Sequence, residues 1–294
     1  MVRSKSAKRF ERLAHTVMIL VTICIVLPFI LLFMSSITSE SALVRDGYSF
    51  FPKEFSIHAY KFIWDNAANV FRAYGITILV TVIGTSINVA MSALLAYPLS
   101  LKNLPGKRIL NFYIFFTMLF NGGLVPTYLM YTGIFHINNT LLAYIVPGLL
   151  MSAMNVMLIR TFFATSIPDA LFEAAQIDGA GHVTILTQIV LPLSKAILAV
   201  MVLYYGVSIW NSWFWASAII RTRELYPLQV ILREILMQND VTSMTTGVGT
   251  MDQESVAMTI KYATIVVATV PILCVYPFLQ KHFTKGTIAG AVKE

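Results

Sequence analysis

The chain has 294 residues and a formal net charge of +7, with 57% hydrophobic and 12% charged residues. A mean hydropathy of +0.74 is too high for a soluble domain of this length, so the composition indicates an integral membrane protein. The basic residues lie in short segments beside apolar runs, as membrane topology requires, and this placement argues against a protein that binds nucleic acid.

The first 15 residues form a basic tail, and an apolar run from Thr16 to Ile37 follows. A signal peptide begins in a similar way, but its apolar core has only about 7 to 15 residues before a cleavage site. The run here has the length of a membrane span, which takes about 20 residues. We therefore predict a retained first transmembrane helix.

Five further runs reach spanning length, which predicts an all-α integral membrane fold with six transmembrane helices inside residues 16–280. With both termini in the cytoplasm, Lys and Arg outnumber Asp and Glu in the inner segments but not in the outer ones, as the positive-inside rule requires. Cys24 and Cys274 fall inside spans, where they act as small apolar residues. The five runs are Tyr74–Leu99, Ile109–Tyr131, Thr140–Ile159, Ala196–Ile220 and Tyr262–Gln280.

Two outer segments are long, residues 38–72 and residues 221–261, and the third, Thr132–Asn139, is expected to be a short turn. The first is expected to contain an interfacial helix after Ser56, with Tyr60, Ile63 and Trp64 at the lipid headgroups. The second carries one apolar helical stripe, followed by a polar loop over residues 239–254. That helix lies on the outer membrane face or on neighbouring helices, or it helps to dock an external partner. Its stripe consists of Leu228, Ile231, Leu232, Ile235 and Leu236.

Asn121-Gly122-Gly123 and Pro126 interrupt the third apolar run near its centre. Irregular backbone at that depth is tolerated only where it is buried in protein or lines a cavity. We therefore predict a bend beside a polar pathway. Tight glycine packing between helices is the alternative.

A water-facing segment, residues 160–195, separates the fourth and fifth spans. Ser166 and Asp169 fit an S-x-x-D capping pattern, so Ser166 is predicted to cap a helix. Gly179 supplies the left-handed residue that ends this helix. A second short helix, broken at Pro192, is expected to follow the glycine turn.

This segment resembles the EAA loop of ABC-importer membrane subunits, because Glu173-Ala174-Ala175 is followed at the right spacing by Gly179, Ile189 and Leu191-Pro192. From about Ala73 onward, the chain resembles carbohydrate-uptake permeases related to the maltose permease, of the LplC/YtcP and alginate-importer type. The resemblance implies that the segment is a cytoplasmic coupling helix, which docks in a groove of an ATPase through Glu173. An ordinary polar loop is the alternative. The residues implied in coupling are Glu173, Ala174, Ala175, Asp178, Gly179, Ala180, Ile189, Leu191 and Pro192.

The resemblance also implies a heteromeric complex in a bacterial cytoplasmic (inner) membrane, with both termini in the cytoplasm. The other members would be a second permease, two ATP-binding subunits and an extracytoplasmic solute-binding protein. The partner ATPase would use ATP and Mg, and this chain would bind no cofactor. The C-terminal tail, residues 281–294, would reach the ATPase interface, or it is a disordered basic end.

The six predicted spans contain no Asp, Glu, Lys, Arg or His, although proton relays and acid–base catalysis need such groups. The sequence also has no phosphate-binding G-x-x-x-x-G-K-[ST] loop and no histidines at metal-ligand spacing. We therefore expect no catalytic residue and no metal site, and an energy source in a partner. A membrane-embedded enzyme or scaffold and a sodium-coupled secondary transporter are the alternatives.

The polar groups in or near the spans are neutral, which suits a sugar. Three tryptophans, Trp210, Trp213 and Trp215, match an interfacial aromatic belt better than a sugar site. Arg221 and Arg223 at the outer mouth attract an acidic oligosaccharide or extend to lipid headgroups. The candidates for the substrate pathway are Asn121, Gly122, Gly123, Tyr128, Asn155, Tyr205 and Asn211.

Overall fold

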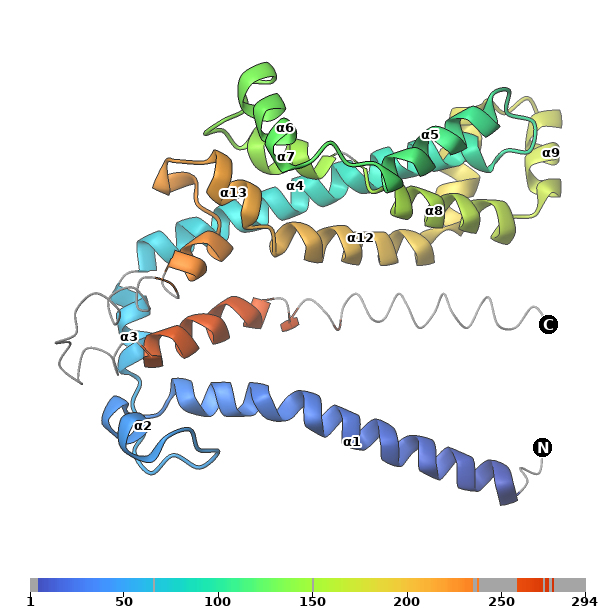
Figure 1. Cartoon of the computed structure of the whole chain (residues 1–294). Coiled ribbons are helices and arrows are strands. Elements are labelled where there is room, and N and C mark those ends of the chain that lie inside the picture. The colour runs from blue at the N-terminus through green and yellow to red at the C-terminus, as the bar shows by residue number, and fades with distance from the viewer. Residues whose placement is uncertain are drawn as a thin grey trace. The chain divides into compact units, whose positions relative to one another are not determined.

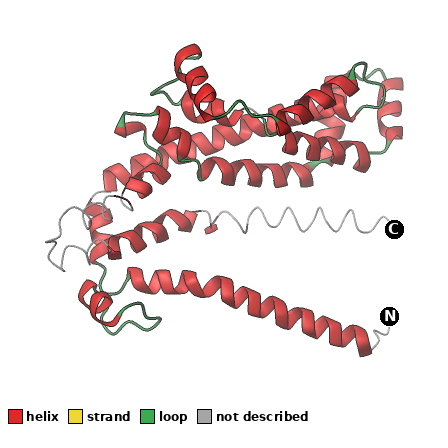
Figure 2. Cartoon of the chain, in the orientation of Figure 1, coloured by secondary structure: helices red, strands yellow, loops and turns green. Residues whose placement is uncertain are grey.

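The computed structural model describes residues 5–65, 67–149, 151–234, 237, 258–271, 273–274 and 277. Within these residues the chain is helical and forms no strand, apart from one isolated bridge between Thr38 and Phe55 (Figure 2). The chain divides into two units, which we describe separately. The terminal unit is Met1–Ala68 with Leu232–Pro271, and the central unit is Asn69–Ile231 with Ile272–Glu294.

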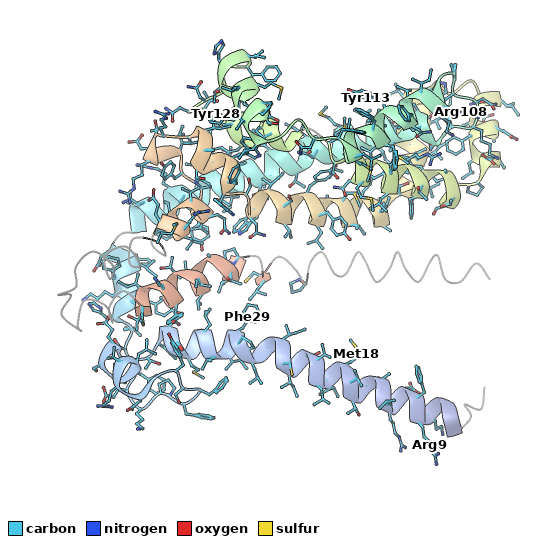
Figure 3. The ribbon with its side chains drawn as sticks, in the orientation of Figure 1. Arg9, Met18, Phe29, Arg108, Tyr113 and Tyr128 are labelled. Atoms are coloured by element: carbon cyan, nitrogen blue, oxygen red, sulfur yellow. The ribbon has the colours of Figure 1, made fainter. Side chains whose placement is uncertain are left out.

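The terminal unit begins with a long apolar helix, α1 (Lys5–Ser36), and continues with two short ones, α2 (Glu40–Asp46) and α3 (His58–Asp65). Large apolar side chains project from α1, among them Met18 and Phe29 (Figure 3). Such a surface suits lipid, because a water-soluble helix would keep one polar face. The helix contains the predicted first span.

The predicted helix after Ser56 is present as α3, but its apolar residues do not all face outward. The Tyr60 hydroxyl is hydrogen-bonded to that of Ser36 at 2.7 Å, and Ile63 packs on a small core that contains Ala59. Trp64 is 71% exposed. Of the three residues predicted to lie at the lipid headgroups, Tyr60 and Ile63 are therefore used inside the unit.

The central unit contains one long helix, α4, that runs along its length, with α9 at one end and α6, α7 and α13 at the other (Figure 1). Residues 228–231 of this unit are also helical, as are residues 232–234 and 258–271 of the terminal unit. In order, the remaining elements are α4 (Ala67–Ser100), α5 (Lys107–Leu119), α6 (Leu124–Leu129), the π-helix η1 (Met130–Ile134), α7 (Leu142–Leu149), α8 (Ala153–Ser166), α9 (Asp169–Ile177), α10 (His182–Ile185), the π-helix η2 (Leu186–Val190), α11 (Leu191–Leu193), α12 (Lys195–Trp210), α13 (Phe214–Ile219) and the 3₁₀-helix η3 (Arg223–Leu225).

Helices α4 and α12 pack closely because small and hydroxyl side chains lie between them. A Cβ on Gly84 would lie 3.0 Å from Cδ1 of Ile209, so any larger residue would have to push the end of that side chain aside. The Ser92 and Tyr205 hydroxyls are buried and hydrogen-bonded at 2.7 Å. The two longest helices of the unit are therefore joined along their apolar faces.

Three described helices are long and apolar enough to cross a membrane: Lys8–Ser36, Ala68–Ser100 and Lys195–Ile219. They contain all or nearly all of the predicted first, second and fifth spans. The third predicted span is a bent pair, in which Lys107–Leu119 and Leu124–Ile134 meet at 110°. The predicted bend is therefore confirmed.

The fourth predicted span, Thr140–Ile159, is not one helix, since α7 ends at Leu149 and α8 begins at Ala153. Ser152 is extended, with φ −62° and ψ 117°, and it occupies the N-cap position of α8. Serine favours that position because its hydroxyl competes for backbone hydrogen bonds inside a helix. The break could not be predicted from hydropathy, because residues 149–153 are nearly all apolar.

Several predictions fall partly or wholly outside the described residues. Leu228 and Leu232 of the apolar stripe are buried in a helix, as expected, but Ile235 and Leu236 are not described. The same holds for the polar loop 239–254, the end of the sixth span and the tail 281–294.

Candidate functional site

Helix α9 begins later than the capping pattern predicts. Ile167 is extended, with φ −105° and ψ 117°, because a residue before proline is driven out of the helical region. Ser166 is therefore the last residue of α8 and not the cap of α9. Pro168 takes the N-cap position of α9, and it makes no side-chain hydrogen bond there. The prediction that Ser166 caps the helix is wrong.

The C-terminal end of α9 follows the prediction. Gly179 has φ +79°, and its backbone N–H donates to the carbonyl of Gln176 at 3.0 Å. The N–H of Ala180 donates to the carbonyl of Ala175 at 2.9 Å, which completes a Schellman motif. No atom lies within 4 Å of a Cβ built on Gly179, so conformation and not space requires glycine there.

The two faces of α9 differ. Ala175 is buried, and Phe172 and Ala180 pack against the same hydrophobic core. On the other side, Glu173 is exposed, and Ile177 at the end of the helix is 86% exposed. Helix α9 is thus held by one face and presents an acidic and an apolar side chain on the other.

The second arm of the segment is a short helix with a π-helical stretch, η2, directly before Pro192. Proline has no N–H to donate, and its ring crowds the carbonyl of the preceding turn. The helix nevertheless continues through Pro192 and ends at Leu193. The predicted break at Pro192 is therefore replaced by an irregular, π-helical stretch before the proline and a helix end one residue after it. Val190 is fully buried, and Ile189 and Leu191 pack partly against the same core as Ala175.

Two side-chain links join this segment to the end of α4. The Lys102 ammonium donates to a carboxylate oxygen of Asp169, and the Tyr97 hydroxyl lies 3.1 Å from Nδ1 of His182. The hydrogen bond and charge of Asp169 raise the pKa of Lys102, and the nearby Glu173 carboxylate adds to this. Sequence analysis missed both links because the partners are 67 and 85 residues apart.

The pathway candidate at the third span lies on irregular backbone. Helix α5 ends at Leu119, and Gly123 has φ +89° before α6 begins. The Asn121 side-chain oxygen accepts the N–H of Gly123 at 2.9 Å. Asn121, Gly122 and Gly123 are all exposed.

The other candidates lie in different surroundings, and the structure does not gather them into one site. Tyr205 is buried, with its hydroxyl engaged by Ser92, and Asn155 is half-buried on α8. The Asn211 amide donates to the carbonyl of Val207 at 2.9 Å.

Tyr128 lines a pocket of about 400 Å³. Figure 3 shows this residue at the end of the central unit opposite Arg108, which lies near the start of α5. A smaller cavity of about 190 Å³ is lined by Thr77, Val80, Tyr144, Pro147, Ser208, Ile209, Ser212, Trp215 and Pro227. Of this second set the sequence drew attention only to Trp215, because the members come from helices far apart along the chain.

Comparison with known proteins gives a consistent result. Residues 88–288 match the family described as "Binding-protein-dependent transport system inner membrane component". The chain is 37% identical over 268 residues to Protein LplC of Bacillus subtilis, covering 91% of this chain and 89% of that protein. It is 37% identical over 289 residues to the polygalacturonan/rhamnogalacturonan transport system permease protein YtcP of Bacillus subtilis, covering 97% and 98%. One chain in the crystal structure of a bacterial ABC transporter involved in the import of the acidic polysaccharide alginate is 30% identical, with a TM-score of 0.79 and coverage of 96% and 99%.

Proposed function

The chain belongs to the family of binding-protein-dependent transport system inner membrane components, and on that premise we propose how it imports a sugar or oligosaccharide as the permease subunit of an ABC importer. The subunit is not itself an enzyme. One observation carries the coupling part of the proposal: a short helix closed by Gly179 presents Glu173 at the spacing of the EAA loop.

In this proposal α9 docks in a groove of the ATPase. Glu173 forms a charge-assisted hydrogen bond with a basic or amide-rich wall of that groove. The small, exposed Ala174 lets the helix approach closely, the buried Ala175 holds the helix on its own core, and the exposed Ile177 adds apolar contact. Asp178, Gly179 and Ala180 form the turn that aims the helix.

Motion then passes from α9 to the membrane as a rigid-body displacement. The core under α9, which includes Val190, ties it to α8 and α12. The Lys102–Asp169 and Tyr97–His182 links tie it to α4. Closure of the ATP-loaded ATPase dimer would move these helices together and change which side of the membrane the pathway faces.

The partners follow from this mechanism. A second permease supplies the other wall of the pathway, two ATPase subunits bind ATP and Mg, and an extracytoplasmic solute-binding protein delivers the sugar. The chain has six spans with both termini in the cytoplasm. This orientation puts α9 and Lys102 on the cytoplasmic side and leaves the basic N-terminal segment there as well.

The substrate class is proposed from two relatives. One is a permease of polygalacturonan and rhamnogalacturonan transport, and the other belongs to an importer of alginate, an acidic polysaccharide. We therefore assign an acidic oligosaccharide to this chain as well.

The test is reconstitution in proteoliposomes of the whole complex, with the second permease, the ATPase and the solute-binding protein that co-purify with this chain. Uptake of an oligosaccharide that requires ATP and the binding protein is the expected result. Uptake that persists without ATP but follows a sodium gradient would instead assign the chain to secondary transport.

A further inference from the structure

The pocket that contains Tyr128 lies in the central unit, at the end away from α9 (Figures 1 and 3). Its volume of about 400 Å³ fits one sugar residue, whereas the cavity of about 190 Å³ is below the usual range of ligand pockets, roughly 300 to 1,000 Å³. In the topology proposed above, this end faces outward. The pocket is lined by Tyr128, Thr132, Asn138, Asn139, Ile219 and Arg221.

Asn139 builds the pocket by joining two segments of the chain. Its side-chain oxygen accepts the backbone N–H groups of Arg221 at 3.2 Å and Thr222 at 2.9 Å. Its side-chain nitrogen donates to the Thr222 hydroxyl at 2.7 Å, and its own N–H donates to the carbonyl of Ile219 at 3.2 Å. Asn139 has φ +58°, which asparagine tolerates better than most residues. The backbone at Arg221 is therefore fixed against the pocket.

Three polar side chains of the lining remain available for a ligand. The guanidinium of Arg221, the hydroxyl of Tyr128 and the amide of Asn138 make no side-chain hydrogen bond to any described residue. Among the described residues, Arg221 is the one charged member of the lining, and none of them brings a carboxylate to the pocket. The described residues that line the smaller cavity are all uncharged.

This set of groups matches one kind of ligand. A guanidinium presents a planar fork of donors that pairs with a carboxylate through two parallel hydrogen bonds. An amide and a phenol serve sugar hydroxyls, and the face of the Tyr128 ring can stack on the C–H face of a pyranose. A neutral sugar would leave the guanidinium without an ionic partner.

Building on the proposed function, we propose that this pocket is a subsite for one uronate residue of the transported oligosaccharide, with Arg221 paired to its carboxylate. Tyr128 and Asn138 hold the ring beside it. The subsite gives the permease its own preference for acidic sugars, in addition to any preference of the solute-binding protein.

The test uses the assembled complex in nanodiscs without the solute-binding protein, so that the permease alone is probed. Digalacturonate and the neutral disaccharide digalactose are titrated, and binding is measured by calorimetry. Arg221→Gln should weaken digalacturonate binding roughly 10- to 100-fold, the loss expected for a hydrogen-bonded charged pair, and leave digalactose binding unchanged. Arg221→Lys should lie between the two, because it keeps the charge and loses the fork. Arg223→Gln is the matched control, since Arg223 does not line the pocket.

The proposal is overturned if the wild-type complex does not bind digalacturonate, or if Arg221→Gln weakens both sugars equally or neither. It is also overturned if the variant loses only the stimulation of ATP hydrolysis by the binding protein, since Arg221 would then be a docking residue. Each of these outcomes leaves the proposed function standing, because that rests on ATP-dependent uptake by the wild-type complex.

Discussion

Two glycines of the central unit both have a positive φ, but one completes the end of a helix and the other lies at a break between two helices. Gly179 has φ +79° at the end of α9, and Gly123 has φ +89° between α5 and α6. At Gly179, two backbone hydrogen bonds complete the helix end, and the neighbouring Ala175 and Ala180 pack on the core. The glycine there makes a short helix rigid.

At Gly123 the preceding chain is left without backbone pairing. Asn121 and Gly122 make no backbone–backbone hydrogen bond to a described residue. The turn is held by the Asn121 side-chain oxygen, which accepts the N–H of Gly123, and by Thr127, whose hydroxyl and N–H donate to the carbonyl of Gly123. A bilayer cannot satisfy such groups, so this stretch has to face water or a protein partner. The comparison teaches that the closed end at Gly179 is completed by the segment's own backbone hydrogen bonds, whereas the open break at Asn121 and Gly122 needs water or a protein neighbour.

The largest expected effect concerns Glu173, the acidic side chain that α9 exposes. Glu173→Ala should weaken attachment of the ATPase by about 2 to 5 kcal/mol, because its partner in the groove would remain buried and unpaired. ATP hydrolysis stimulated by the binding protein should fall accordingly in proteoliposomes, with insertion of the permease unchanged. Gln176→Ala, at another exposed position of α9, is the control. Equal stimulation in the Glu173 and Gln176 variants would remove Glu173 from the interface.

The closed end itself is tested by Gly179→Val. A left-handed conformation costs an ordinary residue roughly 1 to 2 kcal/mol, and a β-branched one more, so the turn should open and misdirect α9. Uptake should fall about tenfold or more. Gly181→Val should be tolerated, because Gly181 has φ −74° and nothing lies within 4 Å of its Cβ position. Similar losses in both variants would show that bulk, and not backbone conformation, matters in this turn.

The open break is tested by the reactivity of a cysteine at Asn121, after Cys24 and Cys274 have been changed to Ala. If the break faces the pathway, Asn121→Cys should react with a small membrane-impermeant thiol reagent, and ATP should change its rate severalfold in the assembled complex. His136→Cys, on the exposed loop and outside the lining of the Tyr128 pocket, serves as the labelling control. Labelling of position 136 alone, with and without nucleotide, would mean that Gly122 and Gly123 only pack against another helix.

Sequence reasoning succeeded where a local signal was strong. The Gly179 turn and the break at Gly123 were both predicted. Glycine adopts positive φ readily, so a glycine at the end of a helical pattern or inside an apolar run usually marks a turn or a break. The start of α9 was missed although its signal was present. Pro168 restricts Ile167, and this restriction outweighs the capping pattern of Ser166.

Long-range contacts explain most of what the sequence did not reveal. Asn139 shapes the outer pocket through partners up to 83 residues away, and no local pattern distinguishes it from Asn138. The pathway candidates were chosen because they are polar residues in apolar runs. This criterion locates a polar side chain, but it does not reveal which residue that side chain contacts in the folded protein. Tyr205, for example, is buried against Ser92 on a helix more than 100 residues away.

The smallest expected effect concerns the link between the closed end and α4. The Lys102 and Asp169 side chains are 74% and 57% exposed, so water and salt screen their attraction. Lys102→Ala should lower the number of sugars moved per ATP roughly twofold at low salt, and should have a smaller effect near 1 M salt, where the Debye length is only about 3 Å. Lys195→Ala, at the start of α12, is the matched control.

The effect of pH on this link has a definite sign. Asp169 raises the pKa of Lys102, so the pair is fully present below the ordinary lysine pKa and is lost only as pH rises through the raised value. Coupling should therefore be constant from pH 6 to 9 in the wild type, as far as this pair is concerned. A double variant, Lys102→Ala with Asp169→Asn, should be no worse than either single variant. Additive losses in that cycle would show that the two residues act separately, and the connection of α9 to α4 would then rest on the Tyr97–His182 contact and the shared hydrophobic core.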